Sequence, residues 1–386
     1  MPKGDQKKPV LWKTLATVSP QEIDAALQSW DGLPPGSGLL ALVCEQEHGA
    51  VAMLQQGART RDIPLVGAVV PGVIAGGRLQ RHGALLLTLS PATQWEILPL
   101  PRTGATTNEM ALQALADFTD RHAAAAGGDT LLLLIDAMTP DIASLLNRLY
   151  LDIGDQVSYA GSSVGSETFQ SVPCLFDHEV FVQDAVLALL LHAHPGATMA
   201  HHYRGSDDLR VATATVGNRI RTIDGRPAFE VYRELMASEY GIPLEQDNFY
   251  RYAVHFPFAL NRAQGEPLVR IPVATADDGS VFCSGEVPEN ALLSIVRAVE
   301  AGDLATAHEV GGHVRSLGST GVLGFYCAGR LMHLGEEAAI AELQALAGIL
   351  APAPLFGALS LGEIGCVGQQ RYPAFHNATL VAIPWL

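Results

Sequence analysis

The chain has few charged residues, and basic residues are the scarcer kind. Charged side chains make up 17% of the 386 residues, and 24 lysines and arginines stand against 40 aspartates and glutamates, which gives a net charge of −16. Proteins that bind nucleic acid or anionic lipid rely on clusters of basic side chains, and here these residues are scattered. We therefore expect neither nucleic acid nor a membrane as a partner.

Cysteine and long apolar runs are also scarce. The five cysteines are odd in number, widely spaced and mostly flanked by apolar residues, which argues against a disulfide framework and favours reduced thiols in the cytoplasm. The longest apolar stretches, such as 130–135 and 184–191, fall well short of the ~20 residues that a membrane span needs. Residues 1–10 are basic but lead into no apolar segment, so we expect no secretory signal.

Apolar residues are abundant, at 48% of the chain, and suffice for more than one core. Three segments repeat the order strand, helix, glycine-bearing strand and return strand. The first strands are expected at 39–44, 131–135 and 322–327, and the helices at 50–59, 140–149 and 336–350. The second strands contain Gly67, Gly161 and Gly357, and the return strands cover 83–89, 185–191 and 379–385.

A half-sheet with a helix on one face cannot bury its apolar surface alone, so the three copies must pack together. We predict an α/β fold in which repeated strand-helix-strand-strand units form mixed sheets flanked by helices. The glycine-lined edges of these units are expected to enclose a cavity for a small molecule.

Two further stretches bear on the organisation of the chain. Residues 213–223 alternate between polar and apolar before the turn dipeptide Asp224-Gly225, which predicts one half-buried strand of a hairpin. Residues 98–107, with two prolines and several threonines, predict a linker. We expect two lobes, at 1–225 and 226–386.

Short motifs along nearly the whole chain carry a family resemblance. In the first part of the chain they include Gly67-Ala68-Val69-Val70-Pro71, Tyr159-Ala160-Gly161-Ser162-Ser163, Pro173-Cys174-Leu175-Phe176 and Pro227-Ala228-Phe229-Glu230-Val231-Tyr232. In the second they are His255-Phe256-Pro257-Phe258, Gly285-Glu286-Val287-Pro288, Phe325-Tyr326-Cys327-Ala328-Gly329-Arg330, Ser360-Leu361-Gly362-Glu363-Ile364 and Phe375-His376-Asn377-Ala378-Thr379. Their order and spacing resemble the FIST family, with a FIST N-type lobe at 1–225 and a FIST C-type lobe at 226–386.

The resemblance implies a sensory protein of intracellular signal transduction that binds a small ligand and is not an enzyme. Some FIST proteins look like haem-binding sensors of nitric oxide. Because the chain shows no appended kinase or cyclase domain, we expect its output to pass through a separate histidine kinase or cyclic-dinucleotide signalling protein.

Four histidines, at positions 192, 194, 201 and 202, fall within eleven residues and are followed by Tyr203 and Arg204. Haem needs a neutral imidazole with polar or basic groups nearby for its propionates. In the haem-binding subgroup that the chain resembles, the position of His201 is commonly histidine, so we expect haem b with His201 or the adjacent His202 as the iron ligand. The alternatives are a zinc site made by the four histidines and plain surface histidines at a strand end.

Several residues of the second lobe are candidates for a ligand pocket. One possibility is a polar pocket that binds an amino acid or similar metabolite and is lined by Arg330, Glu363 and Asn377. The alternative is a purely structural ion pair between Arg330 and Glu363. Cys327 beside Arg330 would be an activated thiol, a haem thiolate or a core residue. His255, next to two phenylalanines, would wall a flat ligand or pack in an aromatic core.

Two motifs resemble those of enzymes. Gly161-Ser162-Ser163-Val164-Gly165 matches the Gly-x-Ser-x-Gly elbow of serine hydrolases, which would make Ser163 a nucleophile, but a shared structural need for glycine at Gly67, Gly161 and Gly357 explains it as well. His308 and His313 lie near a glutamate, as in zinc proteases. Their spacing of five residues is wrong for that site, and the glycines between them are expected to break the helix.

Overall fold

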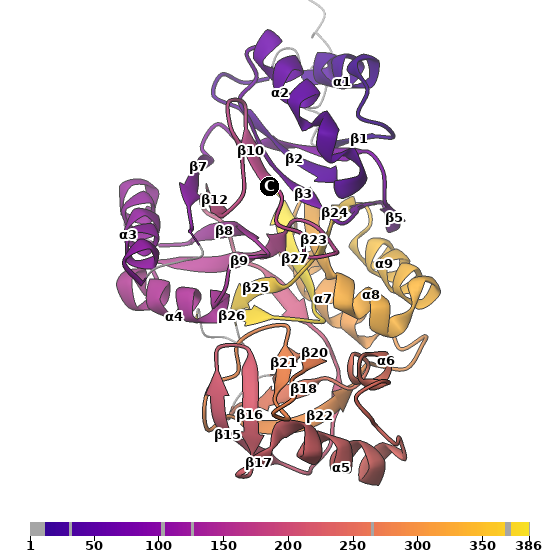
Figure 1. The fold of residues 1–386 in the computed structure, drawn as a ribbon. Coiled ribbons are helices and arrows are strands. Elements are labelled where there is room, and N and C mark those ends of the chain that lie inside the picture. The colour runs from indigo at the N-terminus through magenta and orange to yellow at the C-terminus, as the bar shows by residue number, and fades with distance from the viewer. Residues whose placement is uncertain are drawn as a thin grey trace, which may run out of the picture.

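The computed structural model describes residues 12–30, 33–101, 105–124, 127–263, 266–366 and 372–385, with the side chains of 105–108 left out. The N-terminal residues 1–10 lie outside the described residues, and so do residues 102–104 of the linker expected at 98–107. The linker stretch begins within strand β7 (Gln94–Pro99) and ends within helix α3 (Ala105–His122). Figure 1 shows the four sheets that the described residues form.

The three repeated units are present, which confirms the predicted α/β fold. The first consists of β2 (Gly38–Cys44), α2 (Val51–Thr60), β3 (Leu65–Val70) and the return strand β6 (Ala84–Leu89). The second consists of β8 (Asp129–Asp136), α4 (Ile142–Ile153), β9 (Val157–Val164) and β12 (Ala185–Leu191). The third consists of β23 (Gly321–Cys327), α8 (Ala328–Leu334), α9 (Glu336–Leu350), β24 (Leu355–Ser360) and β27 (Leu380–Trp385). In each unit the first strand pairs parallel with the second and antiparallel with the return strand.

Each unit also lends a hairpin to a neighbouring unit. From the first unit, β4 (Val73–Ala75) pairs with β24 and with β5 (Arg78–Gln80). From the second, β10 (Leu175–Asp177) pairs with β3 and with β11 (Phe181–Val182). From the third, β25 (Glu363–Cys366) pairs with β9 and with β26 (Pro373–His376). This cyclic exchange joins the three units, so none of them is a sheet of its own residues alone.

Three edge strands and three further helices complete the three sheets. The edges are β1 (Trp12–Leu15), β7 and β13 (Thr198–Ala200). Helix α1 (Pro20–Leu27) packs on α2, α3 packs on α4, and α7 (Ala305–Ser316) packs on α9. Short 3₁₀ turns occupy Gln28–Trp30 and Glu45–Ala50. None of the helices in the described parts of the chain is long and apolar enough to span a bilayer.

The glycines of β3, β9 and β24 serve close contact between backbones. A Cβ atom on Gly67, Gly161 or Gly357 would lie 2.3, 1.9 or 1.8 Å from a carbonyl oxygen of the paired parallel strand. The ends of the same strands meet through backbone hydrogen bonds, such as Ser163 N–H to Gly362 O at 2.8 Å and Gly165 N–H to Val69 O at 2.9 Å. The expectation that these edges enclose a cavity is therefore wrong, because backbone hydrogen bonds and one cluster of buried apolar side chains join the three units at this point.

A fourth sheet lies between the second and third units in the sequence and at the lower end of the molecule in Figure 1. Its strands are β14 (Arg204–Gly205), β15 (Arg210–Val216), β16 (Arg219–Ile223), β17 (Arg226–Pro227), β18 (Phe258–Asn261), β19 (Leu268–Arg270), β20 (Pro272–Thr275), β21 (Val281–Cys283) and β22 (Leu292–Arg297). Helices α5 (Ala228–Tyr240) and α6 (Phe249–Ala253) accompany it.

The structure of residues 213–223 differs from the single strand that the sequence predicted. They form two strands and not one, because the chain reverses at Gly217-Asn218, where Gly217 has a φ of 57°. The expected lobe boundary at 225/226 falls in the next turn, between β16 and β17, which pair with each other. Strands from both sides of that boundary therefore share one sheet.

Candidate functional site

The four clustered histidines separate into two places in the structure. His192 and His194 lie at the end of β12, where they contact Asp129 at 3.1 Å and Thr130 Oγ1 at 2.8 Å. His201 and His202 follow β13, and their backbone N–H groups both donate to the carboxylate of Glu266. Among the described residues, no group of three or more histidine, cysteine, aspartate or glutamate side chains is arranged to hold a metal ion. The zinc alternative therefore has no ligand set in this part of the chain.

The imidazole of His201 is buried, with 1% of its surface exposed, and both ring nitrogens are in use. Nε2 donates to Pro267 O at 2.8 Å, and Nδ1 accepts from Tyr203 N–H at 2.9 Å, which is the pattern of a neutral imidazole. Burial lowers the pKa of His201 and keeps the ring neutral. His202 is half-exposed, and its Nε2 contacts Glu309 at 2.6 Å. These contacts do not fit haem, because His201 has no nitrogen left for iron.

The neighbouring candidates also have partners within the protein. The Tyr203 hydroxyl contacts His333 Nδ1 at 2.6 Å, and exposed Arg204 pairs with Asp303 at 3.3 Å. His255 is exposed, and its ring centre lies 5.7 Å from that of His333. The phenylalanines beside His255 pack instead on tyrosines of α5. The structure therefore does not assemble these side chains into the wall of a flat pocket.

Arg330 is held in a fully buried ion pair, and its partner is Glu342 of α9. Nε and Nη2 donate to the two carboxylate oxygens of Glu342 at 2.8 and 2.7 Å. Further donor groups bind Thr306 Oγ1 and His201 O, each at 2.8 Å. The expected pairing of Arg330 with Glu363 is wrong, because the guanidinium donates to Glu342, to Thr306 and to the carbonyl oxygens of His201 and Ala378.

Glu363 is buried without a cation. Its carboxylate accepts from Thr379 Oγ1 at 2.6 Å and from the hydroxyl of Ser360 and the thiol of Cys327. Asn377 accepts from Ser284 Oγ at 3.1 Å. Burial raises the pKa of the Cys327 thiol, the opposite of what an activated nucleophile needs. The structure buries Cys327, Glu363 and Asn377 among protein partners.

The buried carboxyl of Glu363 predicts a pH dependence of stability. Burial raises its pKa from 4.5 to about 7, although hydrogen bonds from Ser360 and Thr379 oppose the shift. Its contribution to stability is therefore full below about pH 4.5 and is lost as the pH rises through about 7. Relative to Glu363→Gln, the wild type should lose about 3 kcal/mol of unfolding free energy across this interval. Urea unfolding at both pH values measures this, and a difference that stays constant with pH would contradict it.

Ser163 lacks the surroundings of a hydrolase nucleophile. It lies within β9, and residues 165–174 after the strand form neither a helix nor a strand, whereas the elbow requires a turn into a helix. The buried hydroxyl of Ser163 has no hydrogen-bond partner among the described residues, and so no histidine base.

The expectation that the glycines between His308 and His313 break the helix is wrong, because α7 continues through both of them. Gly311 instead lets the helix pack closely, since a Cβ there would lie 2.9 Å from Ile349.

A cleft that was not predicted from the sequence opens at the carboxyl end of β8, with a volume of about 490 Å³. We call it the β8 cleft. It lies between the second unit, the start of the third unit's hairpin and the fourth sheet. Its lining residues are Ala137, Met138, Thr139, Pro140, Asp141, Ile142, Phe169, Asn218, Tyr250, Val273, Cys283, Ser284, Gly285, Glu286, Leu361 and Phe375. Ligands of α/β proteins commonly bind at the carboxyl ends of parallel strands.

The polar groups of the β8 cleft gather at the start of α4. The Glu286 carboxylate accepts from Ser144 N–H at 2.9 Å and from the Ser144 hydroxyl, so it caps the helix from the fourth sheet. Asp141, in the left-handed region with a φ of 55°, is the residue before the helix but does not cap it. Thr139 is 9% exposed, and its hydroxyl has no hydrogen-bond partner among the described residues. A buried unpartnered hydroxyl is costly unless a ligand or water satisfies it.

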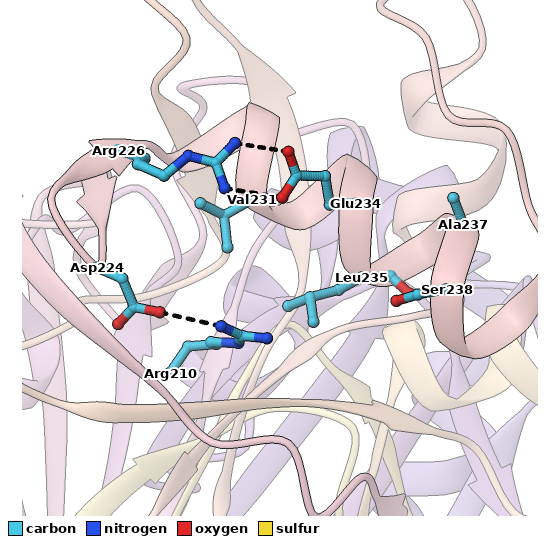
Figure 2. Close-up of a pocket in the computed structure, with 8 residues that line it drawn as sticks. All are labelled: Arg210, Asp224, Arg226, Val231, Glu234, Leu235, Ala237 and Ser238. Atoms are coloured by element: carbon cyan, nitrogen blue, oxygen red, sulfur yellow. Dashed lines mark hydrogen bonds and ion pairs between the residues drawn. The ribbon is translucent and has the colours of Figure 1, made fainter.

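A second groove, of about 630 Å³, lies on the fourth sheet beside α5. Figure 2 shows that its charged side chains face one another. Arg226 donates to both carboxylate oxygens of Glu234, at 2.8 and 2.5 Å, and Arg210 lies 3.5 Å from Asp224. Because these charges already have partners at the surface, the groove offers a ligand fewer polar contacts than the β8 cleft does.

Comparison with known protein families identifies two domains in the chain. The FIST N domain matches residues 39–226, and the FIST C domain matches residues 228–366. No curated protein matches the chain. FIST domains are associated with the sensing of small ligands in signal transduction. One sequence signal does point to the β8 cleft, since Gly285 and Glu286 of the motif Gly285-Glu286-Val287-Pro288 line it. With both domains matched in order across most of its length, this chain belongs to the FIST family.

Proposed function

We propose that this protein is a small-ligand sensor whose ligand binds in the β8 cleft and whose signal passes to a separate protein. The observation that carries the proposal is the buried, unpartnered hydroxyl of Thr139 at the carboxyl end of β8. A cleft that leaves such a group unsatisfied gains free energy when a ligand supplies a partner. The family resemblance favours a non-enzymatic protein, and the odd-numbered, widely spaced cysteines favour the cytoplasm.

The position of the β8 cleft suits a sensor. Thr139 and Asp141 belong to the second unit, Leu361 to the third, and Ser284 and Glu286 to the fourth sheet. A ligand that contacts all three parts binds most tightly to one arrangement of them and so shifts the population towards it. The partner that reads this shift is, on the family resemblance, a histidine kinase or a cyclic-dinucleotide signalling protein.

A tryptophan at the mouth of the β8 cleft should abolish ligand binding. Val273 lines the cleft from β20 and is exposed, so Val273→Trp fills space without disturbing the core. Val180→Trp, at an equally exposed valine in the turn between β10 and β11, is the matched control. Thermal-shift screening with a panel of amino acids, amines and carboxylates supplies the probes, since a ligand at a hundredfold its Kd adds about 2.7 kcal/mol of stability. Hits that bind Val273→Trp as well as the wild type would refute the site.

Haem is the alternative ligand, and it is the one that the family resemblance and the histidines at 201 and 202 predict. It requires that His201 release Pro267 O or Tyr203 N–H, or that His202 leave Glu309. The absorption spectrum of the protein from haem-replete cells tests it directly. A Soret band that disappears in the double variant His201→Ala and His202→Ala would support haem against the β8 cleft.

A further inference from the structure

The β8 cleft carries negative charge without a basic side chain. Asp141 and Glu286 are the charged residues among those that line it. The guanidinium of Arg270 is buried behind Gly285, and its donors bind the carbonyl oxygens of Glu286, Val269 and Phe375 at 2.8, 2.9 and 3.2 Å. The field inside the cleft therefore favours a cation over an anion.

The two carboxylates differ in what they are free to bind. Glu286 is engaged with Ser144 at the start of α4. The exposed carboxylate of Asp141 makes no hydrogen bond or ion pair with any described residue, although its place before the helix would let it cap the first turn. Because the Glu286 carboxylate caps α4, the Asp141 carboxylate is available to bind a ligand.

The third feature is an apolar rim. Phe169 and Tyr250 line the cleft and are 55% and 59% exposed, which is unusual for aromatic side chains. Phe169 also has a φ of 54°, a strained value for a bulky residue that persists where the surrounding structure enforces it. Aromatic faces attract organic cations as well as apolar groups.

We propose that the β8 cleft binds a small organic amine. The ammonium group pairs with Asp141 and donates to the Thr139 hydroxyl, and the apolar body of the ligand lies against Phe169 and Tyr250. This inference rests on the proposed role of the β8 cleft as the ligand site and adds the chemical class of the ligand.

Three probes with the same phenyl-ethyl body test the head group: phenethylamine, 3-phenylpropionate and phenylalanine. Titration calorimetry of the full chain should show phenethylamine binding, with 3-phenylpropionate at least tenfold weaker. Asp141→Asn keeps a residue that tolerates the left-handed backbone and should weaken phenethylamine by on the order of 10-fold to 100-fold, the usual range for a hydrogen bond to a charged group. Asp152→Asn, at the other end of α4, is the matched control and should bind as the wild type does.

A second variant separates the loss of a ligand contact from the loss of the folded state. Thr139→Val removes the hydroxyl at constant volume and should weaken phenethylamine while leaving the circular dichroism spectrum unchanged. Tighter binding of 3-phenylpropionate than of phenethylamine, binding of phenylalanine that ignores Asp141→Asn, or no binding of phenethylamine would each overturn the amine proposal. If other ligands are then found that Val273→Trp blocks, the β8 cleft stands as the site and only the ligand class is wrong.

Discussion

An alanine in place of Gly357 will prevent the chain from reaching its folded state. The added Cβ would lie 1.8 Å from Gly324 O in the paired strand β23, where neither backbone can move without breaking the ladder of the third unit. Overpacking of a core usually costs 1–3 kcal/mol, and a clash with the backbone costs more than that. We therefore expect loss of soluble protein, or a free energy of unfolding lowered by more than about 4 kcal/mol. Urea unfolding followed by circular dichroism measures it.

Gly348 of α9 is the control for this substitution. A Cβ there meets nothing within 4 Å, and the residue is exposed in the last turn of the helix. Gly348→Ala should leave the protein as stable or raise its stability by up to about 1 kcal/mol, because alanine is the better helix former. A soluble Gly357→Ala protein with the same Tm as Gly348→Ala would show that the strands are not packed as described.

Loss of the carboxylate of Glu342 should be nearly as damaging. Glu342→Gln leaves the guanidinium of Arg330 buried without a counter-charge, and breaking such a pair by removing one partner costs about 3–5 kcal/mol. The variant also weakens the acceptor of the Tyr326 hydroxyl, which lies 2.8 Å from Glu342. Guanidinium unfolding of the purified protein checks the loss.

Glu337→Gln provides the comparison within the same helix. Glu337 lies one turn earlier in α9, is exposed, and should change the free energy of unfolding by no more than about 0.5 kcal/mol. Equal effects of the two substitutions would mean that Arg330 finds water or another carboxylate when Glu342 is neutral, and the ion pair would then be dispensable.

These two predictions both concern the interior of the third unit, where β24 packs closely on β23 and a buried ion pair joins α8 to α9. The strand exchange places β25 of the third unit on β9 of the second, next to the loops that line the β8 cleft. Changes at the cleft therefore have a direct path of paired backbone to the third unit. This is the physical basis on which a ligand there would alter the surface that a partner protein reads.

The histidine cluster shows where sequence reasoning failed. His194 and His201 are seven residues apart, but β13 lies between them and pairs with β27, which carries the chain from the second sheet to the third. His194 ends against Pro384 O, and His201 ends against Pro267 O. Proximity along the chain therefore did not mean a shared site, because a crossover between sheets separates the two residues.

The β8 cleft shows what the sequence could not reveal. Thr139, Phe169, Tyr250 and Leu361 come from four distant segments, and no local spacing links them. By contrast, the family motif that contains Glu286 was visible, but its partner Ser144 could be found only in the structure.

The sequence by itself determined the three α/β units, their helices and the glycines of their second strands, since these depend on periodicity and on residue types within about forty residues. Only the tertiary structure decided that the glycine strands close on each other, that Arg330 pairs with Glu342, and that a cleft opens beside α4. The physical reason is that local pattern fixes which face of a strand or helix is apolar, whereas the pairing of backbones and buried charges depends on which distant segments share a sheet.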